Sequence, residues 1–294
     1  MTLLRWFHPF VACLMLSGLL PLIHRRLHPR VSAVVLAASV VWISTVAVIG
    51  IWLVALRYLA HISWLADQFQ WCSKIVGAHS TVSMWVGLPA VAATITGIVR
   101  AVRFSRVQRT LRSSRLRGTS IVASDDVFAF VVPGPDGATI VSSGLLRHLG
   151  PDEQEVVFAH ERAHAEHRHD RYLTIGRAAE AVLPVIRPLT RRLEFSLERW
   201  ADDAAVAAVA AVNGDRVLVA RTIAKVALLP HRSGQPSLAF AGFGEAARAE
   251  FLLDPPPRSH LLTALAVSSS AVGLTFALYQ LHHFEALFDT LCRT

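Results

Sequence analysis

The chain of 294 residues is 53% hydrophobic and only 17% charged, and its mean hydropathy is +0.44. Such a composition argues against an ordinary soluble domain and indicates a membrane protein. The formal net charge of +8 comes mostly from arginine, which suits either nucleic acid or an anionic membrane surface. The three cysteines form no CxxC pair, which argues against a cysteine zinc site or a disulfide framework.

Four long apolar stretches run along the chain, at about residues 3–23, 31–56, 82–99 and 261–281. As a helix, each is long enough to cross about 30 Å of hydrocarbon. The first stretch could also be a signal peptide, but the basic "HRRLHPR" that follows it and the missing small-residue cleavage site favour a retained helix. We therefore expect four transmembrane helices.

The positions of the arginines predict the orientation of these helices. Arginine clusters follow the first and third helices, whereas the 57–81 loop holds only Arg57 and Lys74. Because cytoplasmic loops are enriched in Arg and Lys, we expect residues 100–258 to be cytoplasmic. The N-terminus, the 57–81 loop and the C-terminal tail would lie outside a bacterial inner (plasma) membrane, where Cys72 and Cys292 could form a disulfide.

The segment "RAVRFSRVQRTLRSSRLRG" after the third helix carries seven arginines and no acid. One interpretation is a helix lying against anionic lipid headgroups, and an equal alternative is a plain topology signal. A nucleic-acid surface is the weaker alternative because the segment adjoins a membrane span, so we expect a lipid bilayer and no direct nucleic acid as partner.

The rest of the chain predicts a domain of mixed α and β structure. Residues 119–150 are β-branched and broken by "PGPDG", which predicts a β-hairpin or two short strands. Helical stretches follow from Pro151 and from about Arg191 to Val212. We predict three parts: membrane helices in residues 1–103, an α+β domain in residues 104–258 inserted between helices three and four, and the fourth helix with a short tail in residues 259–294.

The stretch "FAHERAHAEHRHDRY" contains the motif HExxH, formed by His160, Glu161 and His164. On a helix, positions i and i+4 share one face, so the two imidazoles can bind one Zn²⁺. Glu161 can then take the proton of a water molecule at the metal as the water attacks a carbonyl. The alternative is a solvated polar helix, which the nearby His167 and His169 favour.

A third zinc ligand is expected on the second helix, in "LEFSLERWADDAAV". We assign this role to Glu198, with Glu194 as the competitor, and we expect Asp202 to orient a ligand histidine. His167 is unsuitable because seven residues of helix separate it from His160 by about 10.5 Å. His169 and Asp170 are close enough in sequence to support the site.

The segments "DDVFAFVVPGPDGATIVSSGLLRHLGPDEQEVVFAHERAH" and "LERWADDAAV" resemble the BlaR/MecR-type integral-membrane zinc metallopeptidases. The resemblance implies four transmembrane helices around a cytoplasmic, gluzincin-like protease domain. It also implies that His160, His164 and Glu198 are zinc ligands and that Glu161 is the catalytic base. The substrate would be a protein, a cytoplasmic DNA-binding repressor of the BlaI/MecI kind, which links the activity to signal transduction and transcription regulation.

Two features depart from this family. The chain ends soon after the fourth apolar stretch, so we expect no penicillin-binding sensor domain. The position nine residues after the first histidine is usually Asp in the family, but here it is His169, with Asp170 next.

Two other functions stay open. A membrane quality-control protease of the HtpX or prenyl-processing type also uses HExxH and E-x-x-A-D. A non-catalytic membrane signalling protein with a structural zinc is the alternative outside the enzymes, although such a site would not need Glu161. The sequence indicates no oligomeric state.

Overall fold

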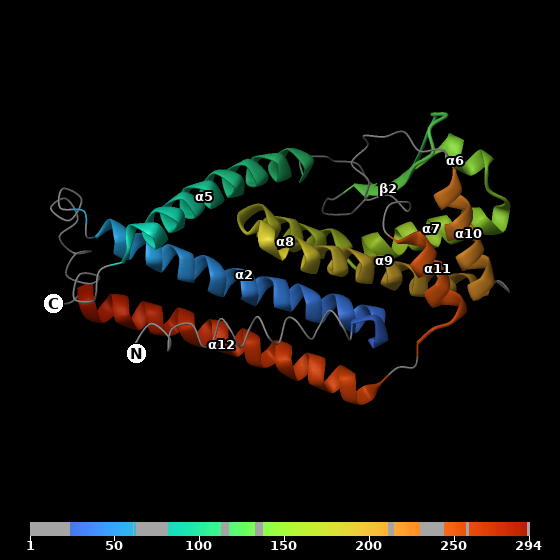
Figure 1. Cartoon of the computed structure of the whole chain (residues 1–294). Coiled ribbons are helices and arrows are strands. Elements are labelled where there is room, and N and C mark those ends of the chain that lie inside the picture. The colour runs from blue at the N-terminus through green and yellow to red at the C-terminus, as the bar shows by residue number, and fades with distance from the viewer. Residues whose placement is uncertain are drawn as a thin grey trace.

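The computed structural model describes residues 24–60, 62, 82–112, 118–132, 138–210, 215–229, 244–256 and 259–292. This part of the chain is mostly helical, with one small sheet (Figure 1). The predicted first membrane helix lies outside the described residues. Cys72 does too, so its bridge to Cys292 stays a prediction.

Three long helices correspond to the second, third and fourth apolar stretches: α2 (Pro29–Leu59), α5 (Met84–Arg112) and α12 (His260–Cys292). Among the described residues, α2 and α5 are long and apolar enough to cross a membrane, whereas the apolar part of α12, His260–Thr275, is shorter. Helix α5 does not end near residue 99 but continues through five arginines to Arg112, because residues 100–112 contain no glycine or proline to end it. The short helix η1 (His24–Arg26) precedes α2.

The β-branched region forms a three-stranded sheet of β1 (Gly118–Val122), β2 (Ala129–Val132) and β3 (Ala138–Ser142), in the order β1-β3-β2. Strands β2 and β3 are antiparallel, which confirms the predicted strand pair. Strand β1 pairs parallel to β3 at the edge and was not expected as a separate strand. Most of its side chains are exposed, so its sequence lacks the alternation of a half-buried strand.

Local hydrogen bonds place the start of the HExxH helix. Helix α6 (Ser143–Arg147) leads to α7 (Pro151–Glu166), which has Gly150 at its N-cap and proline at its first position. The backbone N–H of Gly150 donates to Oε2 of Glu153 at 2.9 Å, and Lys225 forms an ion pair with the same carboxylate. The predicted helix start at Pro151 is therefore confirmed.

The helical region after Pro151 divides into two helices. Arg168 adopts the left-handed conformation (φ 54°), which interrupts the helix and separates α7 from α8 (His169–Val182). After the short helix η2 (Pro184–Ile186), α9 (Arg187–Val209) returns alongside. Helix α9 is the predicted second helix, although it begins and ends earlier than residues 191 and 212.

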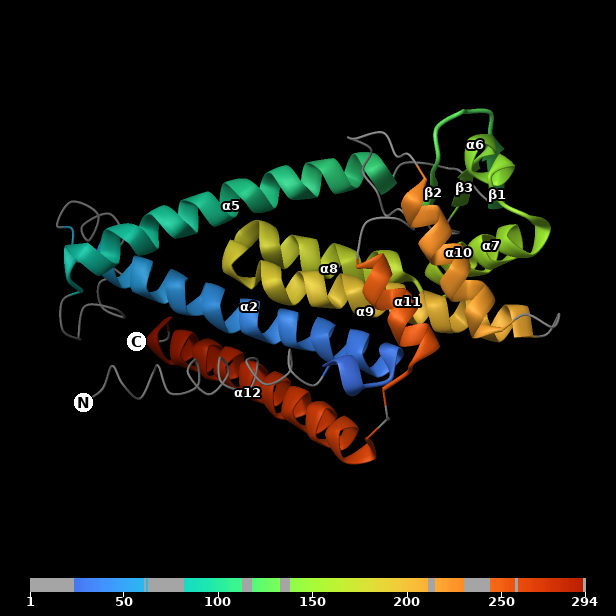
Figure 2. The same ribbon diagram turned by 45° about the vertical axis from the view of Figure 1, so that its right-hand side comes forward.

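Two apolar clusters hold these elements together. One joins the sheet and α7 to the C-terminal end of α9 and to α10 (Arg216–Leu228) and α11 (Glu245–Leu253). The other joins α8 and the N-terminal half of α9 to α2. Figure 2 shows α8 and α9 between α2 and α5, with the sheet, α10 and α11 at the far end of the molecule. Helix α9 thus belongs to both clusters.

Candidate metal centre

Helices α7 and α9 bring three of the predicted site residues together. One ligand atom each of His160, His164 and Glu198 lies within 4.8 Å of the others. The Nε2 atoms of the two histidines are 3.1 Å apart. They lie 3.4 Å and 3.5 Å from the carboxylate oxygens of Glu198. The four-residue spacing in α7 and the crossing of α9 therefore produce a cluster of two imidazoles and one carboxylate.

This cluster fits a zinc ion by its spacing and its chemistry. Tetrahedral ligand atoms about 2.0–2.2 Å from Zn²⁺ are about 3.4 Å from one another, close to the separations seen here. Two histidines and one glutamate leave a fourth position for water or substrate, as in catalytic rather than structural zinc sites. The side chains of His164 and Glu198 are 11% and 14% exposed, so the cluster is not completely closed to solvent.

Glu161 is buried next to the cluster. Glu161 is the residue after His160 on α7. Neither of its carboxylate oxygens has a hydrogen-bond partner among the described residues. Burial raises the pKa of Glu161 to about 7, against the opposing charge of His160. A buried carboxylate without partners is costly unless another group comes to it. Glu161 therefore has the position and the pKa of a group that exchanges a proton with a bound water molecule.

Asp202 lies one turn after Glu198 on α9 and holds the far side of His160. Its Oδ1 atom is 3.0 Å from Nδ1 of His160. Burial alone favours the neutral imidazole, but Asp202 and Glu198 outweigh it and raise the pKa of His160 to about 9. In the metal-free protein the ring of His160 is therefore protonated on both nitrogens at neutral pH. A metal ion would displace one of these two protons on binding.

Arg248 on α11 is a member of the site that the sequence did not indicate. Its guanidinium is fully buried and donates two hydrogen bonds to Asp202, at 2.8 and 2.6 Å, and its Nη1 atom is 3.0 Å from Glu198. Burial alone would raise the pKa of both carboxyls, but Arg248 holds the pKa of each well below its usual range. Arg248 thus keeps both acids ionised and fixes their orientation.

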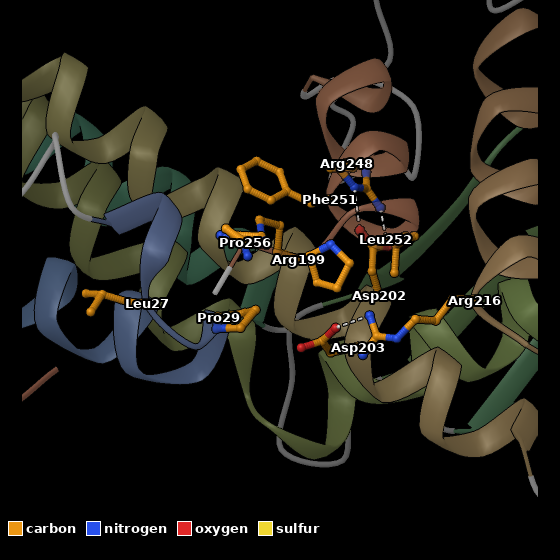
Figure 3. Close-up of a pocket in the computed structure, with 11 residues that line it drawn as sticks. Leu27, Pro29, Arg199, Asp202, Asp203, Arg216, Arg248, Phe251, Leu252 and Pro256 are labelled. Atoms are coloured by element: carbon orange, nitrogen blue, oxygen red, sulfur yellow. Dashed lines mark hydrogen bonds and ion pairs between the residues drawn. The ribbon is translucent and has the colours of Figure 1, made fainter. Parts of the chain in front are cut away.

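Figure 3 shows the Arg248 side of α9, where a pocket opens next to the site. The guanidinium of Arg248 reaches Asp202, and the neighbouring Asp203 points away to Arg216, at 3.6 Å. The N-terminal side of the same helix is tied to α2, because Ser196 and Ser32 share a buried hydrogen bond of 2.8 Å. The helix that carries Glu198 is therefore held from both sides.

His169 supports the second ligand histidine. The Nδ1 atoms of His169 and His164 are 2.9 Å apart, and His169 is fully buried. Burial, with some help from His164, lowers the pKa of His169 far below its usual range, so its ring is neutral. This contact spans the break between α7 and α8 at Arg168.

The structure separates three other candidates from the cluster. Glu194, the competitor of Glu198, pairs with Arg177 at 3.6 Å, and burial raises its pKa. His167 caps α7 and stacks on Trp200 at 4.7 Å. Asp170 shows no interaction with the cluster in the described part of the chain; the carboxylate that orients a ligand histidine here is that of Asp202.

Residues 100–222 match the family model described as Peptidase family M48. The matched range contains the HExxH motif of α7 and Glu198 of α9, and it supports a metallopeptidase. Neither a curated protein nor a solved structure matches the chain. The predicted metallopeptidase is thus supported at the level of a family, and the BlaR type and the absent sensor domain stay predictions.

Proposed function

We propose that this protein is a zinc-dependent membrane endopeptidase whose active site faces the cytoplasm. The observation that carries the proposal is the cluster of His160, His164 and Glu198 with the buried, partnerless Glu161 beside it. A structural metal site would gain nothing from Glu161, because burying a carboxylate without a partner costs free energy. The non-catalytic signalling protein is therefore the weaker hypothesis.

In this site, His160, His164 and Glu198 would hold Zn²⁺, which when bound polarises a carbonyl and makes a water molecule a better nucleophile. Glu161 takes the proton of the attacking water and passes it to the leaving amine. Its pKa near 7 suits both steps, since a general base works best when its pKa is near the working pH.

The contacts that His160 and His164 make on the side away from the metal would determine which ring nitrogen of each carries the proton. With its Nε2 atom towards the metal, His164 carries its proton on Nδ1 and donates it to Nδ1 of His169. Nδ1 of His160 likewise faces Oδ1 of Asp202 at 3.0 Å, and Arg248 holds Asp202 in place. Such partners orient metal ligands and raise their basicity.

The membrane location is supported by the surface of α5. In the most apolar part of α5, only 11% of the residues are buried inside the molecule, whereas the corresponding share in α2 is 44%. Trp85 is 81% exposed, and Ile95 and Ile98 are each more than half exposed. An exposed apolar surface along a helix of this length is unfavourable in water and favourable in contact with lipid. We propose a multi-pass arrangement with the N-terminus outside and the peptidase domain in the cytoplasm.

For the substrate, we propose a cytoplasmic protein, and by the BlaR/MecR resemblance a DNA-binding repressor. The quality-control protease of HtpX type is the second candidate, and the matched family is consistent with it. The two differ in selectivity: a regulatory protease cuts one folded partner, whereas a quality-control protease degrades unfolded proteins. Incubation of the purified protein with unfolded casein and with candidate repressors would separate them.

The central test compares Glu161→Gln with Glu166→Gln, an exposed glutamate on the same helix. We expect about one zinc per chain in the wild type and in both variants, because Glu161 is not a ligand. Peptidase activity should fall by about 10²–10⁴-fold only in Glu161→Gln. Unchanged activity in Glu161→Gln, or no zinc in folded wild-type protein, would contradict the proposal.

A further inference from the structure

The turn that joins α8 to α9 lies beside α2 and α5, the two helices in the described part of the chain that are long and apolar enough to cross a membrane. Figures 1 and 2 both show α8 and α9 between α2 and α5, with the turn directed towards the end at which α2 and α5 meet. At that end Gly87 packs against the ring of Tyr58. We call residues 182–188, "VLPVIRP", the hairpin tip.

On the α5 side, the hairpin tip reaches the apolar part of the helix. A Cβ atom added to Gly97 would lie 3.4 Å from Cγ1 of Val182, so the two helices touch there. Gly97 precedes Arg100, the first arginine of α5, by three residues. The hairpin tip thus extends past the level at which the charges of α5 begin.

On the α2 side, the hairpin also contacts the uncharged part of the helix. Ile186 and Leu189 share one apolar cluster with Trp42 and Ile43. Trp42 lies thirteen residues after Pro29, or about 20 Å along the helix. Both neighbours of the hairpin tip therefore present the uncharged parts that we propose to lie in the membrane.

The free surface of the hairpin tip is apolar with a basic border. Val185 is 76% exposed and the adjacent Pro184 is exposed as well. Arg187 and Arg191 follow on the first turns of α9, both exposed, and Arg187 pairs with Glu180 at 3.4 Å. An exposed apolar turn with arginines just behind it fits the boundary between acyl chains and phosphates, because arginine can extend its charge to the headgroups.

We propose that the hairpin tip inserts into the cytoplasmic side of the bilayer, with Pro184 and Val185 among the acyl chains and Arg187 and Arg191 at the phosphates. The inference rests on the proposal that α5 spans the membrane, and is independent of peptidase activity. Glu198 lies twelve residues after Ile186 on α9, so the site is at most about 18 Å from this contact. A membrane-anchored substrate would need about six extended residues to reach it.

Single-cysteine labelling of the full chain tests this. The three native cysteines are replaced by serine, and the protein is reconstituted in vesicles with anionic lipid. An environment-sensitive fluorophore is attached in turn to Val185→Cys, to Ile95→Cys on α5 and to Val217→Cys on α10. All three positions are exposed aliphatic residues. Quenching by doxyl-labelled lipids and by aqueous iodide is then compared.

We expect doxyl lipids to quench the labels at positions 95 and 185 but not at 217, and iodide to quench only the label at 217. If positions 185 and 217 behave alike while 95 is lipid-quenched, the hairpin tip does not enter the bilayer. If 95 is not lipid-quenched either, the membrane position of α5 fails and the inference fails with it.

A charge reversal provides a second readout. Arg191→Glu should weaken lipid quenching at position 185 in anionic vesicles, because the carboxylate repels the headgroups. Arg221→Glu, an exposed arginine on α10, is the matched control and should leave the quenching unchanged. Equal effects of the two reversals would argue against phosphate contact by Arg191.

Discussion

The N-terminal half and the middle of α9 both bury most of their inward-facing side chains, but they are stabilised in opposite ways. The N-terminal half packs apolar side chains such as Leu189 and Leu193 against α2. The middle of the helix carries Glu198 and Asp202, which face a buried arginine and two histidines. One helix therefore joins an apolar contact with the membrane part to a charged centre.

The comparison indicates what each end can tolerate. Apolar contacts are non-directional, so a change of shape costs free energy roughly in proportion to the volume that is lost. Buried charges depend on particular partners, and removal of one partner leaves the other uncompensated. We therefore expect substitutions at the charged centre to weaken or abolish metal binding or to lower the stability of the metal-free protein, and substitutions at the apolar contact to lower stability without changing metal binding.

The largest effect is expected for Glu198→Ala. Removal of the only carboxylate among the three clustered ligands should abolish the stoichiometric zinc of the purified protein, as should His160→Ala. Glu194→Ala, one turn earlier and paired with Arg177, is the matched control and should keep its zinc. Metal analysis of the three variants decides this; zinc lost in Glu194→Ala but kept in Glu198→Ala would exchange the two roles.

Some residues of the metal site could be predicted from the sequence alone and others could not. HExxH is a local pattern, and the spacing of four from Glu194 through Glu198 to Asp202 put all three acids on one helical face. Arg248 escaped prediction because it lies 46 residues after Asp202 on a separate short helix. A single arginine on an amphipathic helix gives no signal that tertiary packing will bury it against two acids.

The helix break at Arg168 escaped prediction for a related reason. No glycine or proline lies near Arg168, so the sequence of the histidine-rich stretch predicts a continuous helix. Across this break His169 lies against His164, whereas Asp170 shows no contact with the cluster in the described part of the chain. Helix periodicity therefore predicted the ligands, whereas the partners around them depend on how separate helices pack.

Arg248→Met should have the next largest effect. It removes the cation shared by Glu198 and Asp202 and leaves two buried carboxylates, which should cost about 3–5 kcal/mol of stability in the metal-free protein. The loss should be smaller with zinc bound, because the metal compensates Glu198. Thermal melting in detergent with and without zinc measures both. Arg221→Met is the exposed control, and an equal shift in both variants would refute the role of Arg248.

At the apolar end, Leu193→Ala should lower the unfolding free energy by about 2–5 kcal/mol, because Leu193 is fully buried between α8, α9 and α2. Leu228→Ala, at a leucine that is 86% exposed, should change it by less than about 0.5 kcal/mol. Zinc content should be the same in both. Zinc loss in folded Leu193→Ala would mean that the apolar half of α9 and the metal site are coupled rather than independent.

The smallest effect, and the sharpest for the comparison, is expected for Asp202→Asn. The amide keeps the volume of the carboxylate and can still accept a hydrogen bond from Nδ1 of His160, but it no longer balances the charge of Arg248. Zinc affinity should fall by about 10–100-fold, the usual loss when a ligand's supporting partner is changed. Competition with a zinc chelator measures it. Asp203→Asn, which pairs with Arg216 away from the metal, is the adjacent control and should bind zinc like the wild type. If both substitutions lower the zinc affinity equally, the site depends on the total negative charge nearby rather than on the contact between Asp202 and His160.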